Sequence, residues 1–224
     1  MFRFASLRLL NTHPPGLLAT MKVAIVGAGV SGLSTYLQLR KLLTPPDSHT
    51  IAIYESQKPD HRGASSNSNA ALARPEGLTD SAAVVGNSIL LSPNSVRLLK
   101  SIDSELYEIF RARGYVSETY TFKTARGQTL AVLPTHDGKL PREYSISCPR
   151  YELWKCLHEV VGEDKIQYRK VVQVDLEGRK PIVKFADGGE EDADLVIGAD
   201  GVRSVVKKAI FGDDNERIYA PHYE

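Results

Sequence analysis

The sequence predicts an α/β fold centred on a parallel sheet, and three neighbouring segments carry that prediction. A short run rich in β-branched residues, Lys22–Val26, ends at a glycine and is typical of a buried strand. Helical spacing of leucines follows over residues 31–43 and stops at Pro45-Pro46. A second β-branched run, Thr50–Tyr54, completes a strand–helix–strand unit, whose two strands should be parallel with a right-handed crossover.

The composition of the 224-residue chain is that of an ordinary globular protein, with 42% hydrophobic and 25% charged residues. Its net charge of +1 gives no electrostatic reason to expect nucleic acid or an anionic membrane surface as a partner. No apolar run approaches the roughly 18–20 residues that a membrane span needs. Six scattered histidines do not predict a metal site. We interpret Cys148 and Cys156 as reduced, buried thiols of an intracellular protein, with a disulfide or redox pair as the alternative.

Residues 1–20 are considered separately from the fold. They contain Arg3 and Arg8 and no acidic residue, a composition typical of a mitochondrial presequence. The alternative is an untranslated or unfolded leader, because the first strand begins directly after them. We therefore expect an intracellular protein, and the residues leave the choice between cytoplasm and mitochondrion open.

Further elements follow from periodicity and turn residues. The middle of the chain is predicted to form a surface loop at 63–73, a helix from Ser92 with Pro93 in its first turn, and a hairpin at 115–133 around Arg126-Gly127. A helix is expected at Arg150–Val161, with Leu153, Trp154, Leu157 and Val160 on one side. After it we expect strands at 166–174 and 181–185 joined by a turn at Glu177-Gly178, a short buried strand at 195–197 and a helix at 202–210.

A glycine-rich turn between the first strand and the first helix is a candidate phosphate-binding segment, here called the cradle (residues 27–32). Its sequence, Gly27-Ala28-Gly29-Val30-Ser31-Gly32, fits G-x-G-x-x-G in the expected strand–turn–helix context. Gly27 permits the tight turn, Gly29 lets the backbone approach a pyrophosphate, and Gly32 allows close packing of the helix on the strand. The helix N-terminus offers N–H groups and positive partial charge to the phosphates, and Ala28 lies within this predicted contact.

Glu55 ends the second strand, where a carboxylate can accept hydrogen bonds from a ribose diol. The same carboxylate would repel a 2′-phosphate, which disfavours an NADP-type adenosine half at this site. The plain alternative is a glycine-rich turn beside a surface glutamate. The cradle and Glu55 alone do not separate FAD from NAD.

A second glycine-containing turn follows the short strand near the end of the chain. Residues 194–204 read DLVIGADGVRS, so a strand runs into Gly-Ala-Asp-Gly and then a helix. Asp200 can accept N–H bonds and fix the turn, and Gly201 allows close approach of backbone to a ligand. An Asx-type turn alone would explain Asp200 and Gly201 but not the whole string.

This string resembles the D-G motif of the FAD-dependent aromatic hydroxylases, the para-hydroxybenzoate hydroxylase-like flavoprotein monooxygenases. Two further stretches agree: residues 86–94 resemble the strand that enters the next helix in that family, and 150–157 (RYELWKCL) resemble its R-x-x-L-x-x-x-L helix. The resemblance implies that Asp200 and Gly201 lie near the flavin pyrophosphate and that Arg150 approaches the bound flavin. A solvated charge at a helix N-terminus is the alternative for Arg150.

The chemistry implied by the resemblance belongs mainly to the cofactor. NAD(P)H would reduce FAD, and the reduced flavin would use dioxygen to transfer one oxygen atom to an aromatic or related small molecule. The residues alone suggest no convincing nucleophile or acid–base pair, so no catalytic residue is assigned. Tyr120, Tyr144 and His158 are interpreted as packing or surface residues.

One departure from the family pattern concerns the end of the chain. Family members continue to a G-D motif that holds the ribityl chain, whereas here Gly212-Asp213 follows the D-G helix too early. We therefore expect a truncated form. Two alternatives to a monooxygenase stay open: a flavin-binding fragment without turnover, either a relic or one half of a two-chain enzyme, and another FAD- or NAD-dependent oxidoreductase that shares the cradle.

The predicted organisation combines a Rossmann-like FAD-binding domain with part of a second sheet. It consists of the leader at 1–20, the discontinuous FAD-binding domain at 21–111 and 148–212, a partial antiparallel substrate-side sheet at 112–147, which strands around 166–185 could join, and a truncated tail at 213–224. The bends at 27–32 and 198–201 are expected to close on opposite sides of one adenine–flavin molecule. The substrate, the choice between NADH and NADPH, and the oligomeric state cannot be read from the chain.

Overall fold

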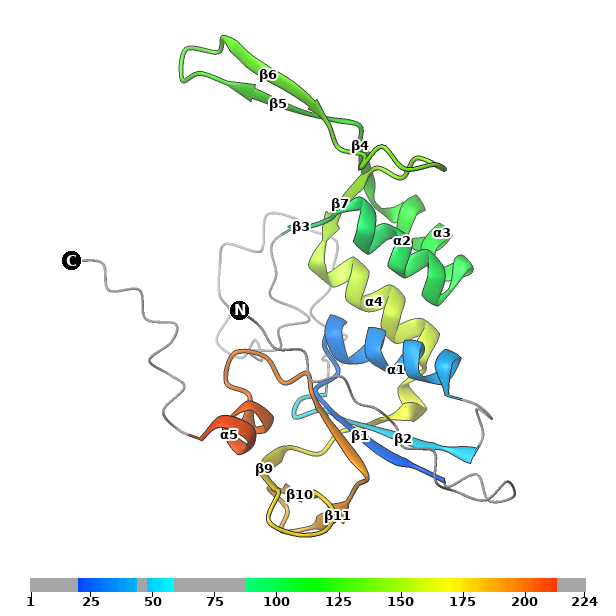
Figure 1. Cartoon of the computed structure of the whole chain (residues 1–224), viewed down its shortest axis with the longest axis vertical. Coiled ribbons are helices and arrows are strands. Elements are labelled where there is room, and N and C mark those ends of the chain that lie inside the picture. The colour runs from blue at the N-terminus through cyan, green and yellow to red at the C-terminus, as the bar shows by residue number, and fades with distance from the viewer. Residues whose placement is uncertain (1–19, 44–47, 59–87, 213–224) are drawn as a thin grey trace, which may run out of the picture.

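The computed structural model describes residues 20–43, 48–58 and 88–212. The predicted leader up to residue 19, the loop at 63–73 and the tail at 213–224 lie outside the described residues. Figure 1 shows a central sheet with helices packed above it and a hairpin that projects from the far end. Within the described ranges, no helix has the length and apolar character needed to cross a bilayer.

A four-stranded parallel sheet forms the centre of the fold, in the order β12-β1-β2-β8. Its strands are β1 (Lys22–Val26), β2 (Thr50–Tyr54), β8 (Ile166–Gln167) and β12 (Leu195–Gly198). Val26 pairs with Tyr54 on one side and with Gly198 on the other, so β1, β2 and β12 end at one edge. The predicted α/β fold and the parallel pairing of the first two strands are confirmed.

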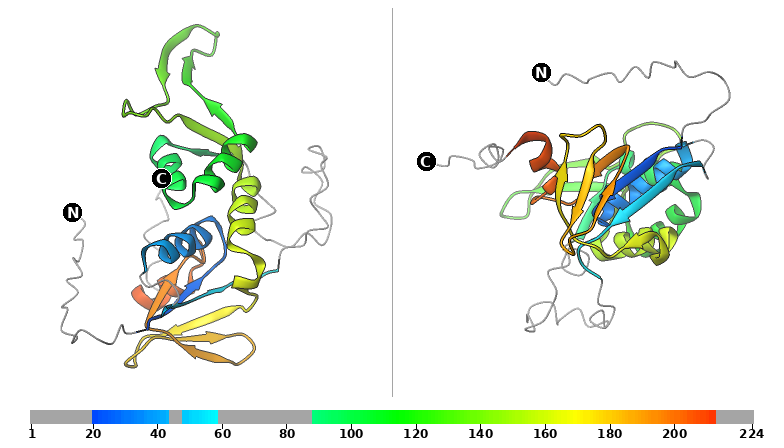
Figure 2. Two further views of the ribbon diagram at one scale, coloured as in Figure 1. Left: turned by 90° about the vertical axis from the view of Figure 1, so that its right-hand side faces the viewer. Right: turned by 90° about the horizontal axis from the view of Figure 1, so that it is seen from below.

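Helices cover one face of this sheet in two tiers. Helix α1 (Val30–Leu42) packs next to the strands, helix α4 (Arg150–Val161) runs alongside α1, and α2 (Pro93–Ile102) and α3 (Ser104–Arg113) lie beyond them (Figures 1 and 2). A short 3-10 turn, η4 (Glu163–Lys165), leads from α4 into β8. One buried cluster joins strands and helices; its fully buried members include Val23, Ile25, Leu33, Ile53, Val96, Leu106, Phe110 and Leu157.

The other face of the parallel sheet is covered by a three-stranded antiparallel sheet, in the order β11-β10-β9, and by α5 (Val205–Phe211). Its strands are β9 (Val171–Asp175), β10 (Ile182–Phe185) and β11 (Glu190–Asp192). The Phe185 ring meets the Tyr54 ring edge-on at 4.8 Å between centroids. These strands therefore pack against the nucleotide-side sheet and do not join a substrate-side sheet.

The single strand predicted at 166–174 is wrong, because the chain divides it between two sheets. Residues 166–167 form β8 of the parallel sheet, and β9 begins only at Val171. Between them a tight turn is closed by the Arg169 N–H, which donates to the Gln167 carbonyl at 2.9 Å. The β-branched pattern continues through this turn, so periodicity alone could not reveal the break.

Three burial or boundary predictions also differ from the structure. Val160 is 37% exposed, and Val161, four residues after Leu157, is buried in its place. Leu195 is 41% exposed because β12 is an edge strand. Val202 is 98% exposed, and α5 begins three residues later, after its N-cap Ser204.

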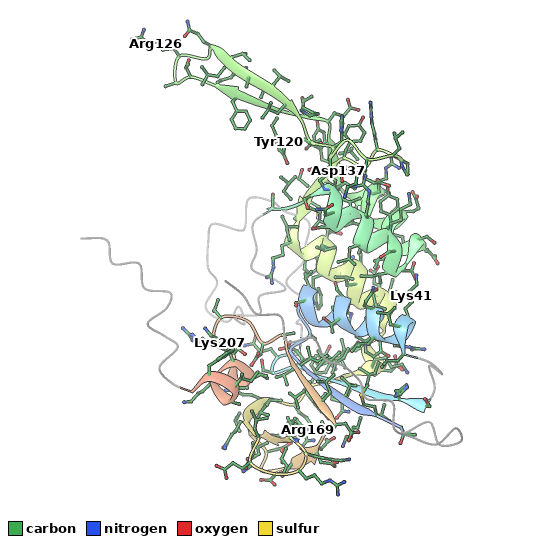
Figure 3. All side chains as sticks on the ribbon, in the orientation of Figure 1. Lys41, Tyr120, Arg126, Asp137, Arg169 and Lys207 are labelled. Atoms are coloured by element: carbon green, nitrogen blue, oxygen red, sulfur yellow. The ribbon has the colours of Figure 1, made fainter. Side chains whose placement is uncertain are left out.

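Strand β3 (Ser88–Leu91), before α2, and the region between α3 and α4 form the second, antiparallel part of the fold. Strands β3, β7 (Ser145–Pro149) and β4 (Tyr115–Ser117) make a small sheet in the order β3-β7-β4. Strands β5 (Thr119–Lys123) and β6 (Thr129–Pro134) form the predicted hairpin, with Arg126 at its tip (Figure 3). One face of this ribbon carries exposed Tyr120, Phe122 and Leu133.

Candidate functional site

The two glycine-containing bends meet at the carboxyl edge of the parallel sheet. From β1 the chain passes through α1 to β2 on one side, whereas β12 pairs with β1 on the other side. Such a point, where the connections leave in opposite directions, is where open parallel sheets bind their ligands. The cradle (residues 27–32) and the bend at 198–201 both follow directly from strands that end there.

Gly27 and Gly32 make the cradle compact. Gly27 has φ +104°, a conformation that favours glycine, and its N–H donates to the Tyr54 carbonyl at 2.8 Å. A Cβ on Gly32 would lie 1.9 Å from the Gly27 oxygen, so α1 can pack on this turn only with glycine there. The tight turn and close helix packing predicted for these two glycines are therefore present.

Gly29 leaves the start of α1 open. The Leu33 N–H donates to the Gly29 carbonyl at 3.0 Å, so the N–H groups of residues 29–32 precede the first bond of the helix. No side chain caps this end, and its first turn contains no acidic residue. A Cβ on Gly29 would meet no atom within 4 Å. Among the described residues, nothing competes with an anion for these donors.

Ala28, between the two glycines, is held at both of its backbone polar groups. Its N–H donates to Glu55 Oε2 at 2.8 Å, and its carbonyl accepts from the Trp154 indole N–H at 2.9 Å. Glu55 Oε1 accepts from the Gln57 N–H at 3.1 Å and from the Ser56 hydroxyl at 3.0 Å. Glu55 therefore contacts the cradle directly, at the end of the strand where it was predicted.

Trp154 is the residue of this site that sequence reasoning missed. The helical pattern predicted only that it would be buried, which it is, at 5% exposed. Its contact with Ala28 spans 126 residues of sequence, and no local pattern signals such a contact. The one available hint was chemical, because a buried indole N–H usually needs an acceptor.

Asp200 organises the second bend. Its Oδ2 accepts from the Val205 N–H at 2.6 Å, and its Oδ1 accepts from the Ser204 hydroxyl at 2.5 Å. The Ser204 hydroxyl oxygen in turn accepts from the Lys207 N–H at 2.9 Å, so both side chains cap α5. Gly201 follows with φ +78° and open space around it. Asp200 thus accepts N–H bonds and fixes the turn, as the sequence predicts.

The expected placement of the two bends on opposite sides of one ligand is wrong. The Ala199 N–H donates to the Val26 carbonyl at 2.7 Å, and a Cβ on Gly27 would lie 2.4 Å from the Ala199 oxygen. The bends are therefore in direct contact, because β1 and β12 are adjacent strands that end in register. A ligand could lie across both bends but not between them.

Arg150 begins α4, one helical turn before Trp154. Residues four apart lie on the same side of a helix, so Arg150 and Trp154 share one face. Trp154 reaches the cradle, and Arg150, half-buried, continues that face toward the small sheet that contains β7. The Trp154 ring also packs against the ring of buried His158 at 4.7 Å between centroids, which makes His158 a packing residue.

The other aromatic side chains considered from the sequence lie in the antiparallel region. Tyr120 is on the hairpin (Figure 3), and its hydroxyl donates to the Ser145 hydroxyl at 3.3 Å. The Tyr144 ring contacts His136 edge-on at 5.5 Å. Both contacts are those of packing residues.

The cysteines are free and buried, as predicted. Burial raises the pKa of Cys148 to about 11 and raises that of Cys156 as well, so both thiols are neutral near pH 7. In the part of the chain that the structure describes, no group of three or more His, Cys, Asp or Glu side chains is arranged to hold a metal ion.

The chain is similar to known FAD-dependent monooxygenases. No family model matches the chain. It is 27% identical over 214 residues to the FAD-dependent monooxygenase pigN of Monascus ruber, covering 91% of this chain and 42% of that protein. It is 29% identical over 212 residues to 3-amino-4-hydroxybenzoate 2-monooxygenase of Streptomyces cremeus, covering 91% of this chain and 44% of that protein.

Solved structures show the same fold. Klebsiella pneumoniae HpxO, in complex with FAD and uric acid, aligns with a TM-score of 0.60 at 18% identity, covering 84% of this chain and 41% of that chain. The chain thus spans less than half the length of each of these proteins. The resemblance carried by the cradle and the Gly-Ala-Asp-Gly string therefore extends along nearly the whole sequence: the chain is similar to FAD-dependent monooxygenases and resembles the FAD-dependent aromatic hydroxylases.

Proposed function

We propose that the chain binds FAD at the carboxyl edge of its parallel sheet and serves an NAD(P)H-dependent monooxygenase of small aromatic molecules. The observation that carries this proposal is the uncapped start of α1, which lies at the switch point of the sheet beside Glu55. This arrangement fits the ADP half of FAD.

The diphosphate would bind to the N–H groups that precede the first bond of α1. These donors carry the positive end of the helix dipole, and phosphate oxygens accept such bonds strongly. Gly29 has open space where any other residue would place its Cβ, so the backbone can approach the diphosphate closely. A hydrogen bond to a charged group contributes about 1.5–3 kcal/mol, so two or three of them would dominate the affinity.

Glu55 would hold the ribose of the adenosine half. Its two oxygens accept three hydrogen bonds from the chain, and a carboxylate has about four acceptor positions. A ribose hydroxyl can therefore be added, or can replace the Ser56 hydroxyl. A 2′-phosphate would place negative charge against this carboxylate, which favours FAD over an NADP-type adenosine half.

The second bend and α4 would extend the site beyond the diphosphate. Gly201 offers backbone in open space next to the cradle, and Asp200 holds that backbone by capping α5. Arg150, on the cradle-facing side of α4, would supply a positive charge toward the flavin end. These three residues complete the proposed cofactor contacts with Gly27, Ala28, Gly29, Gly32 and Glu55.

When bound, FAD supplies the redox chemistry, accepting a hydride from NAD(P)H and activating dioxygen for transfer of one oxygen atom to the substrate. The residues described here bind and orient the cofactor, and none is assigned a catalytic role. The Streptomyces relative is named for a substituted benzoate, which supports a small aromatic substrate for this chain.

A flavin-binding chain without turnover is the alternative that the sequence left open, and one experiment separates it from the monooxygenase. Purified chain would be saturated with FAD, and the retained cofactor would be released by denaturation and identified by its absorbance and mass. NADH and NADPH oxidation would then be followed with and without substituted benzoates.

Retained FAD with aromatic-stimulated oxidation supports the monooxygenase. Retained FAD without stimulation supports the alternative. Failure to retain the added FAD would contradict the proposed function.

A further inference from the structure

The Ala28–Gly29 peptide group lies at the most open point of the cradle, and a side chain from a distant helix holds it in place. We propose that Trp154 is a positioning residue whose indole N–H sets the direction of the Gly29 N–H toward the FAD diphosphate. This inference rests on the proposed function and assigns a further residue to the same site.

The geometry of a trans peptide links the two groups. In a planar trans peptide the carbonyl of one residue and the N–H of the next point in opposite directions. The Ala28 carbonyl points at Trp154 Nε1, 2.9 Å away in the protein interior. The Gly29 N–H therefore points away from the Trp154 indole. The Cβ position of Gly29 is also open, because a Cβ there would meet no atom within 4 Å.

Trp154 is itself held firmly, so it can impose this orientation. It is 5% exposed, and its ring contacts the Tyr151 ring, at 5.9 Å, and the His158 ring, at 4.7 Å between centroids. The Ala28 N–H is fixed independently by Glu55 Oε2. Both peptide groups that flank the Ala28 Cα are thus fixed from outside the cradle, one by α4 and one by the end of β2.

The benefit of this arrangement is preorganisation. A peptide group without its carbonyl partner could rotate and turn the Gly29 N–H away from the ligand, and binding would then have to restore the productive orientation. The hydrogen bond to the Ala28 carbonyl also polarises the same peptide, which makes the Gly29 N–H a better donor. Simple burial of an indole would account for the packing of Trp154 but not for any dependence of ligand affinity on its N–H.

The chain offers a clean test because Trp154 is its single tryptophan. A tryptophan auxotroph supplied with the benzothiophene analogue of tryptophan would replace the ring N–H by sulfur at this one position. Trp154→Phe provides a second variant if the analogue is poorly incorporated. Leu153→Val is the matched control, because Leu153 is buried in the same helix and has no polar contact with the cradle.

Two quantities would be measured: FAD affinity by titration calorimetry, well below each variant's Tm, and the Gly29 amide signal by 15N NMR without ligand. We expect the analogue and Trp154→Phe to weaken FAD binding by about five- to tenfold and to shift the Gly29 amide signal. Leu153→Val should lower the Tm yet leave both quantities unchanged.

Unchanged FAD affinity in the analogue and in Trp154→Phe would overturn the positioning role while leaving the proposed function intact. An equal loss of affinity in Leu153→Val would also overturn it, because general loosening of α4 would then be the cause. If the unmodified chain binds no FAD, the proposed function fails and this inference fails with it.

Discussion

Gly29 and Gly32 stand three residues apart in the cradle, and the structure predicts that they fail in different ways when replaced. Gly29→Val should abolish FAD binding and leave the fold nearly unchanged. Gly32→Ala should destabilise the fold itself. The difference arises because a Cβ meets open space at Gly29 but would lie 1.9 Å from the Gly27 oxygen at Gly32.

The magnitudes follow from these contacts. Overpacking costs about 1–3 kcal/mol of folding stability. Because a backbone oxygen cannot rotate away from the new Cβ, we expect Gly32→Ala to cost about 3 kcal/mol. Better helix propensity offsets about 1 kcal/mol, which leaves about 2 kcal/mol, or a fall in Tm of about 4–8 °C for a chain of this length. Gly29 has φ −72°, which any residue adopts, so its replacement costs at most about 1 kcal/mol as a poorer N-cap.

The two variants should rank in the opposite order for FAD binding, with the larger loss of affinity in Gly29→Val. A valine side chain at Gly29 would separate the diphosphate from at least two N–H donors, a loss of about 3 kcal/mol or more, or a hundredfold in affinity. Circular dichroism melts and FAD titrations would measure both effects, with Gly178→Ala, in the exposed turn between β9 and β10, as the control. A Gly29→Val protein that still retains FAD, or a Gly32→Ala protein with an unchanged Tm, would refute the reasoning.

Further predictions concern Glu55, Asp200 and the cysteines. Glu55→Ala should weaken FAD binding by about 1–3 kcal/mol in calorimetry, and unchanged affinity would remove Glu55 from the ribose. Asp200→Ala should lower stability to chemical denaturation by about 1–2 kcal/mol through loss of the α5 cap, more than Gly178→Ala does, and equal midpoints would contradict the capping role. The folded pKa of Cys148, about 11, lies above its ordinary value of 9.0, so its contribution to stability is complete below pH 9 and is lost as the pH rises toward 11. Melts across this range should show a steeper decline for the parent chain than for Cys148→Ala, and identical slopes would argue against a raised pKa.

Local sequence patterns were sufficient to predict most strands, turns and helices of the nucleotide-binding half. The β-branched runs at β1 and β2 carry their own periodicity, and glycines mark the turn where a Cβ would collide, so strand, turn and helix were all readable. The role of Asp200 was also readable, because an aspartate in a Gly-Ala-Asp-Gly turn can accept nearby N–H bonds, and Asp200 does accept the Val205 N–H.

Features that depend on long-range packing could not be read. The division of residues 166–174 between two sheets depends on which strand each half meets, and the β-branched pattern is the same in both halves. Helix α3 was not separated from α2, although Asp103 caps it through the Leu106 N–H, because the helical pattern continues across the junction. The contact between Trp154 and Ala28 joins segments that only the folded sheet brings together.

The contact between the two bends is a similar case. Each bend was predicted from its own glycines, but their separation depends on strand order, which placed β12 directly beside β1. Adjacent parallel strands in register leave no room for a ligand between their ends. The proposed site therefore lies over the edge of the sheet.

A crystal structure of the chain with bound FAD would test the proposed site most directly. The account predicts diphosphate oxygens within hydrogen-bond distance of the Gly29 and Val30 N–H groups, with ribose hydroxyls on the Glu55 carboxylate. FAD bound elsewhere, or bound with the diphosphate away from the start of α1, would contradict it.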